Sequence, residues 1–228
     1  MCGISGFINF DNFIDGKKII DEMNRSLRHR GPDLSGTWNN EAKNIFLGHT
    51  RLSIIDLSNN GNQPMISRSG NKILIFNGEI YNHKLIRDKL SFNNWKGNSD
   101  SETLLECINE IGIENTLSEI TGMFAFAIFD NNKQTLHLVR DRLGEKPLYY
   151  FYDKNKFIFA SELKSILKFP KIQKTLNKNA INHFLKYSYI PSPITIYENI
   201  YKLNPSELIS LKITKNKIQK KNIQLLVS

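Results

Sequence analysis

The sequence contains only two cysteines, Cys2 and Cys107, among its 228 residues. So few cysteines argue against a disulfide framework and favour a reducing compartment. No apolar run approaches the roughly 20 residues that a membrane span needs. The N-terminus, MCGISGFINF, lacks the basic segment that opens a secretory signal. The composition therefore predicts a cytoplasmic protein with no membrane partner.

Arginine is missing from residues 164–228, although this segment accounts for the excess of positive over negative charge. It holds 12 lysines and 2 glutamates, whereas residues 1–163 hold 19 basic and 20 acidic residues, within a net charge of +9. Proteins that read DNA sequence favour arginine for bidentate contacts to guanine. No nucleic-acid-binding motif accompanies the lysines. We therefore expect a solvated lysine-rich surface and no nucleic-acid partner.

Metal and nucleotide motifs are also missing. No glycine-rich phosphate-binding loop occurs in the sequence. The histidines do not show metal-ligand spacing. The sequence therefore predicts no metal site and no cofactor within this chain. The five histidines are His29, His49, His83, His137 and His183.

The segments that are present alternate between short strands and helices. Residues 2–10 read as a strand, and four apolar runs between 122 and 162, separated by Asn, Asp and Gly turns, read as antiparallel hairpins. Further strands are expected at 45–55, 72–81, 195–203 and 207–213. Apolar periodicity and capping residues predict the helices. These are residues 15–28, 81–90, 101–111, 162–168 and 177–187. The pattern predicts an α+β fold.

Cys2 is a candidate nucleophile because removal of Met1 would place an α-amine beside its thiol. A free α-amine has a pKa of about 7.7 to 8.0, which suits a general base at neutral pH. One residue would then supply both the nucleophile and the base. A lone cysteine at the start of a strand is also an ordinary packing residue. Cys107, in an apolar helical segment, is expected in the core.

Nine sequence blocks in fixed order accompany Cys2. Together they closely resemble the glutaminase half of glutamine-dependent asparagine synthetases, which are class II glutamine amidotransferases. The resemblance covers about residues 2–212. The blocks are MCGI (1–4), RHRGPD (28–33), HTRLSIID (49–56), NQPM (62–65), FNGEIYNH (76–83), SDSE (99–102), GMFAFAIFD (122–130), RDRLGEKPLYY (140–150) and FASELKSI (159–166).

The resemblance implies how L-glutamine would be bound. Arg51 would clamp the α-carboxylate, which suits a planar guanidinium. Asp100 would take the α-ammonium, with Glu79 beside it. The four residues after Arg51 would line the same pocket. They are Leu52, Ser53, Ile54 and Ile55.

The resemblance also implies the catalytic groups. Cys2 would attack the side-chain amide, and the oxyanion would be held by the Asn77 side chain and the Gly78 backbone N–H. Such donors typically contribute a few kcal/mol to stabilising the transition state. His29 and Arg30, within RHRGPD, would support the site structurally.

Local sequence also allows other interpretations of these residues. Arg51 fits a surface ion pair, and Asp100 fits a helix N-cap within Ser-Asp-Ser. Asn77-Gly78 is a dipeptide of tight hairpin turns. These interpretations stay open at the level of the sequence.

The resemblance further implies the four-layer αββα sandwich of N-terminal-nucleophile hydrolases over residues 1–212, followed by a Lys-rich tail at 213–228. The family's ATP- and Mg-dependent synthetase domain, which amidates aspartate to asparagine, is absent from this sequence. A synthetase domain or subunit is therefore an expected partner, and a homodimer is a further expectation. Three alternatives remain: a glutaminase of glucosamine-phosphate or phosphoribosylamine synthesis, a non-catalytic remnant that binds glutamine or a partner, and a glutaminase serving a different carboxylate acceptor.

Overall fold

The computed structural model describes residues 1–11, 15–214 and 217–224, and their strands form two six-stranded antiparallel sheets. The first sheet has the order β10-β8-β9-β1-β3-β2, and the second has the order β12-β11-β7-β6-β5-β4. The strands are β1 (Gly3–Asn9), β2 (Leu34–Asn40), β3 (Ile45–Arg51), β4 (Met65–Ile66), β5 (Lys72–Ile80), β6 (Gly122–Asp130), β7 (Thr135–Arg140), β8 (Tyr149–Tyr152), β9 (Lys156–Ala160), β10 (Ile200–Lys202), β11 (Glu207–Thr214) and β12 (Lys217–Gln224).

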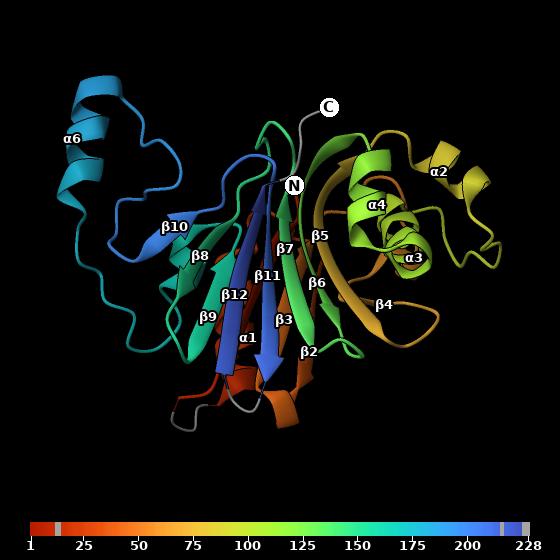
Figure 1. Ribbon diagram of the computed structural model, residues 1–228, viewed down its shortest axis with the longest axis horizontal. Helices are drawn as coiled ribbons and strands as arrows, with labels where there is room; N and C mark the ends of the chain where they lie inside the picture. Colours follow the sequence, from red (N-terminus) through yellow and green to blue (C-terminus); the bar gives the residue numbers. More distant parts are fainter. Residues whose placement is uncertain (12–14, 215–216, 225–228) are drawn as a thin grey trace.

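Helices cover the outer faces of both sheets (Figure 1). The first helix begins after Asp15, whose side chain accepts a hydrogen bond from the Lys18 N–H at 3.1 Å. The helices are α1 (Gly16–Ser26), α2 (His83–Lys89), α3 (Asp100–Ile111), α4 (Ile113–Glu119), α5 (Leu163–Ile166) and α6 (Lys178–Tyr187), with short 3-10 turns η1 (Glu41–Lys43) and η2 (Asn59–Gly61).

The central strands are buried on both faces, so alternate residues enter different layers. In β1, Ile4 and Ile8 pack between the two sheets, whereas Phe7 packs against α1 and α5. In β5, Ile75 faces the space between the sheets, whereas Phe76 faces α2, α3 and α4. Strand side chains alternate in this way because successive Cβ atoms point to opposite faces. The result is three apolar layers between four structural layers, as the expected αββα sandwich requires.

Most of the expected elements are confirmed. Helices α1, α2, α3, α5 and α6 and strands β1, β3 and β5 to β11 lie within the segments where the sequence predicted them, with ends shifted by a few residues. Four elements were missed: β2, β4, α4 and β12. The segment 195–203, expected as a strand throughout, is a strand only at Ile200–Lys202.

The segment expected as a Lys-rich tail contains part of the second sheet. β12 pairs with β11 from Glu207 opposite Gln224 to Thr214 opposite Lys217. Ile213 and Ile218 are both buried between the sheets. The expected boundary at residue 212 therefore falls inside β11, and the fold continues to the last described residues. Residues 215–216 and 225–228 of the expected tail lie outside the described part.

Asn77-Gly78 is not a turn. Both residues lie within β5, which pairs with β6 over its whole length. The pattern of apolar residues on both sides of the dipeptide, which fills two layers of the sandwich, outweighs its local turn preference.

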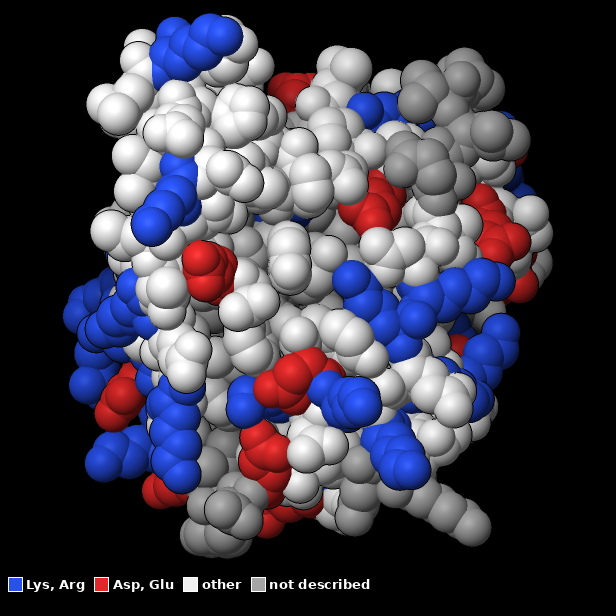
Figure 2. All heavy atoms as spheres, turned by 60° about the vertical axis from the view of Figure 1, so that its left-hand side comes forward, with Lys and Arg blue, Asp and Glu red and all other residues white. Residues whose placement is uncertain are grey.

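α6 extends away from the sheets at the end of the molecule opposite α2 (Figure 1). Only Ala180 of this helix is buried, and Leu185 is 77% exposed. Figure 2 shows lysine and arginine side chains spread over this face among acidic and uncharged ones rather than gathered into one patch. Among the helices that the structure describes, none is long and apolar enough to cross a membrane.

Candidate active site

A pocket of about 120 Å³ opens where the start of β1, the end of β3, the end of β5 and the start of α3 meet. All ten residues that the sequence predicted for the site line it, although they come from four separate segments. Nine further residues also line the pocket. The expected residues are Cys2, Arg51, Leu52, Ser53, Ile54, Ile55, Asn77, Gly78, Glu79 and Asp100.

The Cys2 thiol lies against the backbone of Leu52. Its Sγ accepts from the Leu52 N–H at 3.4 Å and contacts the Leu52 carbonyl oxygen at 3.6 Å. Burial raises the pKa of the Cys2 thiol above its ordinary value, against the lowering effects of the Leu52 contact, the terminal ammonium and Arg51. The thiol is therefore protonated at neutral pH, and a base is needed to generate the thiolate.

Met1 occupies part of the pocket wall next to Cys2. Its sulfur lies 3.6 Å from Lys146 Nζ and 3.9 Å from a terminal nitrogen of Arg30. While Met1 is present, the nitrogen of Cys2 is an amide and has no basic lone pair. Loss of Met1 would both create the α-amine and widen the pocket at this point.

The Asn77 side chain offers an unused donor. Asn77 is 1% exposed and lines the pocket, and its Nδ2 has no hydrogen-bond partner among the described residues. A buried amide group without a partner is rare, because desolvation without a hydrogen bond costs about 1 to 3 kcal/mol. The geometry therefore leaves an N–H donor ready for an oxygen placed in the pocket.

The Gly78 backbone N–H points away from the neighbouring strand β6. Phe124 lies opposite Gly78, but its own N–H and C=O are bonded to Asp141, at 3.2 and 2.8 Å. In an antiparallel ladder this leaves Gly78 in a pair without mutual hydrogen bonds. Glycine is required here, because a Cβ would lie 2.3 Å from the carbonyl oxygen of Met123.

The amides on either side confirm the direction of the Gly78 N–H. Along β5, N–H groups two residues apart point the same way. The Phe76 N–H donates to Gln63 Oε1 at 2.6 Å, and the Ile80 N–H donates to Asp100 Oδ2 at 2.9 Å. The Gly78 N–H lies between these two and faces the pocket.

Arg51 has a structural task that the sequence did not reveal. Its guanidinium donates to the Ser58 carbonyl at 2.8 Å, to the Asp56 carbonyl and to Asn62 Oδ1. These bonds fix the loop after β3, which forms one wall of the pocket. A guanidinium has five N–H donors, so two remain beyond these three contacts within the described chain.

The loop residues after Arg51 form the outer wall. The Ser53 N–H donates to Asp33 Oδ2 at 2.8 Å, which ties the loop to the turn before β2. Ile54 is 70% exposed and Ile55 is 39% exposed, so this wall borders solvent.

Asp100 is the first residue of α3 and is 6% exposed. Burial raises the pKa of its carboxyl to about 6, with the Ile80 and Ser101 N–H groups lowering the pKa and Glu79 raising it. The N-cap of α3 is Ser99, not Asp100. A buried carboxylate with a raised pKa favours a cation as its partner.

Residues around Asp100 hold the start of α3 in place. The Ser99 hydroxyl accepts from the Glu102 N–H at 3.2 Å, and the Glu102 carboxylate accepts from the N–H groups of Lys96 and Gly97, at 2.8 and 2.9 Å. Arg87 donates to the carbonyls of Gly97 and Ser99, both at 2.8 Å. The Ser-x-x-Glu spacing signals a capped helix, but the role of Arg87 has no sequence signal.

His49 connects the two sheets behind the pocket. Its Nε2 lies 3.1 Å from the Phe76 carbonyl, and burial lowers its pKa to about 4. The imidazole is therefore neutral and donates its Nε2–H to that carbonyl. This bond fixes β5 immediately before Asn77.

A charged network supports Cys2 from the side away from the pocket. Arg30 Nε donates to the Cys2 carbonyl at 2.9 Å, and Arg30 is paired with Glu162 at 3.0 Å. Sequence reasoning expected structural support from His29 and Arg30 but gave Glu162 no role. In the part of the chain that the structure describes, no cluster of His, Cys, Asp and Glu is arranged to hold a metal ion.

Comparison with known proteins gives one consistent family. The model of the glutamine amidotransferase domain matches residues 1–222. A putative glutamine-hydrolysing asparagine synthetase of Methanocaldococcus jannaschii is 40% identical over 96% of this chain and 46% of its own length. Asparagine synthetase 1 of Bacillus subtilis is 34% identical over 93% of this chain and 34% of its own length. The chain therefore spans less than half the length of these relatives.

A relative with a different name and a solved structure extend the comparison. Amidase chry2 of Gibberella zeae is 35% identical over 92% of this chain and 32% of its own length. The glutamine phosphoribosylpyrophosphate amidotransferase of B. subtilis has a TM-score of 0.66 at 18% identity, covering 96% of this chain and 49% of its own. That structural match confirms the fold. Taken with the match of the domain model over nearly the whole chain, these findings show that the chain belongs to the glutamine amidotransferase domain family.

Proposed function

We propose that this chain hydrolyses L-glutamine to glutamate and ammonia, with Cys2 as the nucleophile. The observation that carries the proposal is the unpartnered Asn77 Nδ2, which lines the same pocket as the Cys2 thiol and the Gly78 N–H. An oxyanion requires hydrogen-bond donors near the nucleophile, and both donors belong to residues that line the pocket of Cys2.

In the first step, the α-amine of Cys2 takes the thiol proton, and the thiolate attacks the carboxamide carbon of glutamine. The carbonyl oxygen becomes an oxyanion held by Asn77 Nδ2 and the Gly78 N–H. The Cys2 ammonium then protonates the amide nitrogen, the C–N bond breaks, and ammonia leaves. Water adds to the resulting thioester with the amine as base, and glutamate is released with the thiol restored.

Substrate binding follows from the charges at the two ends of the pocket. The remaining N–H donors of Arg51 would hold the α-carboxylate, and Asp100 would hold the α-ammonium beside Glu79. Leu52 to Ile55 would contact the substrate as the outer wall. The raised pKa of Asp100 supports this assignment, because a bound ammonium would stabilise the buried carboxylate.

The direct test is to incubate the purified chain with glutamine alone and quantify glutamate and ammonia. We expect turnover at a rate that does not depend on ATP or magnesium. Alkylation of Cys2 should abolish this turnover. A chain that binds glutamine without any turnover would instead favour the non-catalytic remnant.

Removal of Met1 is the first specific prediction. Intact mass should show loss of one methionine, because the α-amine cannot act as a base within a peptide bond. A chain with an uncleaved N-terminal extension before Cys2 should be inactive, and proteolytic exposure of Cys2 should restore activity. A C-terminally tagged chain is the matched control. Full activity in protein that retains Met1 would refute the N-terminal-nucleophile mechanism.

Asn77→Ala tests the oxyanion hole. We expect kcat to fall about a hundredfold with little change in KM, because the lost hydrogen bond forms mainly in the transition state. Steady-state kinetics measure this split. Asn115→Ala, which removes an exposed asparagine of α4, is the matched control. A large rise in KM at unchanged kcat would place Asn77 in substrate binding instead.

We further propose that the ammonia serves an ATP- and Mg-dependent synthetase, as a domain or a separate subunit, that amidates aspartate to asparagine. The names and greater lengths of the relatives support this proposal. The exposed apolar side chains of α6 are of the kind that a partner covers. The chain alone, given aspartate and ATP, should form no asparagine.

A second acceptor class is specifically supported by the relative named an amidase. A glutaminase that serves another carboxylate would use the same pocket, so only assays with the partner and different acceptors separate the two. The free thiols Cys2 and Cys107 support the cytoplasm as the location, because a reducing compartment keeps thiols free. The homodimer stays a prediction, which size-exclusion chromatography with light scattering checks.

A further inference from the structure

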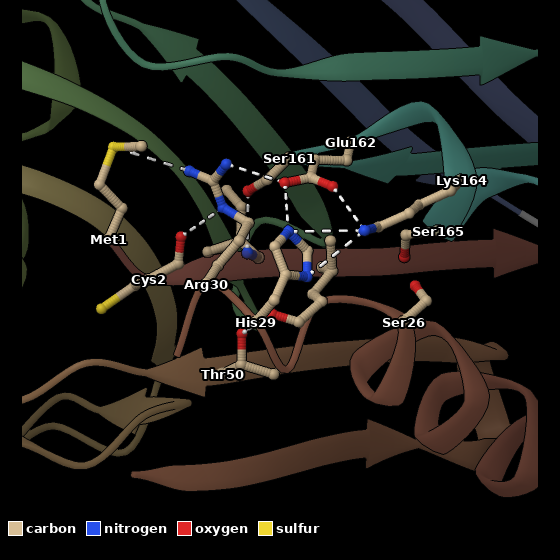
Figure 3. A network of polar contacts seen from close by, with 12 residues as sticks. Met1, Cys2, Ser26, His29, Arg30, Thr50, Ser161, Glu162, Lys164 and Ser165 are labelled. Carbon is tan, nitrogen blue, oxygen red and sulfur yellow. Dashed lines mark hydrogen bonds and ion pairs between the residues drawn. The ribbon is translucent and has the colours of Figure 1, made fainter. Parts of the chain in front are cut away.

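Glu162 lies at the centre of a charged network beside Cys2 (Figure 3). One carboxylate oxygen, Oε1, binds Arg30 Nη1 at 3.0 Å and His29 Nε2 at 2.9 Å. The other oxygen lies 3.2 Å from Lys164 Nζ. Burial raises the pKa of Glu162, but the bonds from Arg30, His29 and Lys164 outweigh it and leave the pKa below its usual value. Glu162 is therefore a carboxylate at neutral pH.

The carbonyl of Cys2 is the main anchor available to the nucleophile. Once Met1 is removed, no residue precedes Cys2, and β1 begins only at Gly3, which pairs with Thr50. Arg30 Nε donates to the Cys2 carbonyl at 2.9 Å. This bond restrains the residue whose thiol must stay beside the Leu52 backbone.

Hydrogen bonds between Ser161, which precedes Glu162, and β1 fix the position of Glu162. The Ser161 N–H donates to the Ile4 carbonyl at 2.9 Å, and the Ile4 N–H donates to the Ser161 hydroxyl at 3.0 Å. Glu162 is the next residue, so its position follows the register between β9 and β1. The Arg30 side chain is only 8% exposed and is clamped between this carboxylate and the Cys2 carbonyl.

We propose that Glu162 is a positioning residue for the nucleophile: by holding Arg30, it fixes the Cys2 carbonyl and keeps the thiol aligned with the Asn77 and Gly78 donors. This inference rests on the proposed hydrolysis of glutamine. Glu162 is not among the residues that line the pocket. A displacement of about 1 Å in a reacting group is enough to lower a rate a hundredfold.

The test compares Glu162→Gln with wild type in glutamine hydrolysis. The substituted glutamine side chain has the same shape as that of Glu162 but lacks the negative charge that holds Arg30. We expect kcat to fall about 10- to 100-fold with KM changed less than about twofold. Glu119→Gln is the matched control, since it neutralises an exposed ion pair with Lys89 on the opposite helical layer. Thermal unfolding of both variants identifies any general loss of folding.

A double-mutant cycle with Arg30→Lys tests whether Glu162 acts through Arg30. Lysine keeps the charge but cannot bridge the Cys2 carbonyl and Glu162 with two N–H groups of one planar fork. The double variant should be no slower than Arg30→Lys alone. Additive losses, a rise in KM instead of a fall in kcat, or unchanged kcat in Glu162→Gln would overturn the proposal.

Hydrogen exchange keeps this inference separate from the proposed function. The peptide covering residues 3–9 should exchange faster in Glu162→Gln than in wild type, whereas the peptide covering β6 should not change. If wild type does not hydrolyse glutamine, the proposed function fails by itself, and unchanged exchange at residues 3–9 would still refute the anchoring role. If wild type is active and Glu162→Gln equals it, only the role of Glu162 fails.

Discussion

Replacing Cys2 with alanine is expected to abolish glutamine hydrolysis while leaving the fold intact. The Cys2 sulfur is the atom of the chain that bonds covalently to the substrate in the proposed mechanism. Its loss should therefore lower kcat at least about a thousandfold. The side chain lies at the edge of the pocket, outside the three apolar layers. The thermal unfolding temperature should therefore change little. Glutamate release, measured with an enzyme-coupled assay, reports the activity.

Cys107→Ala is the matched control for this prediction. Cys107 is 1% exposed and packs in the layer between the second sheet and its helices. Removing its sulfur should lower the free energy of unfolding by about 1 to 2 kcal/mol and leave kcat and KM essentially unchanged. Retained hydrolysis in Cys2→Ala, or its loss in Cys107→Ala, would show that the nucleophile is wrongly assigned.

Asp100→Asn is expected to weaken glutamine binding and stabilise the fold at the same time. The bound α-ammonium would lose its charged partner in a buried place, which typically costs about 2 to 5 kcal/mol, so kcat/KM should fall at least about thirtyfold. Asparagine still offers an oxygen to the Ile80 N–H, which Asp100 Oδ2 accepts at 2.9 Å. The fold therefore keeps its local hydrogen bond.

The stabilisation has a defined pH range. The pKa of Asp100 in the fold is about 6, above an unfolded value near 3.9. The folded protein therefore favours the neutral carboxyl. The contribution of Asp100 to the free energy of unfolding is fully present below about pH 4 and is lost as the pH rises through about 6. Asn avoids this loss, so the variant should be more stable than wild type above pH 6 by up to about 3 kcal/mol.

Thermal unfolding from pH 4 to 7 measures the difference in stability between wild type and Asp100→Asn. Kinetics of glutamine hydrolysis over the same range measure how kcat/KM depends on pH. In wild type, kcat/KM should already fall below about pH 8 as the Cys2 α-amine becomes protonated. It should fall more steeply below about pH 6, because a neutral Asp100 no longer pairs with the ammonium. Normal affinity for glutamine in Asp100→Asn would refute the pocket proposed above. Equal stability of the two proteins at every pH would show that burial does not destabilise the charged carboxylate of Asp100.

The effect expected for Asp100→Asn illustrates how this site is built. The pocket holds an unpartnered amide and a buried carboxylate, and both are unfavourable in the empty fold. The surrounding bonds keep them in place: Arg51 fixes the outer loop, Arg87 fixes the start of α3, and His49 fixes β5. Groups that a substrate would satisfy are thus held ready by groups that it does not touch.

The sequence alone determined the family, the αββα architecture and the set of residues that gather at the pocket. Ordered blocks such as HTRLSIID and FNGEIYNH carry this information through their resemblance to a known family, whereas the periodicity of strands and helices alone predicted only an α+β fold. Most helices were also predictable, since their apolar faces and caps are local signals. Asn77-Gly78 shows the limit of such signals, because its local preference is a turn and its place is within β5.

Only the tertiary structure decided how those residues are supported. The lysine-rich strand β12 was missed because its many polar residues gave no strand pattern around Ile218, which completes the layer between the sheets. The loop-holding bonds of Arg51 and the link from Glu162 through Arg30 to Cys2 join residues up to 132 positions apart. No local pattern encodes such contacts, because they depend on the strand register that brings β1, β3 and β9 side by side.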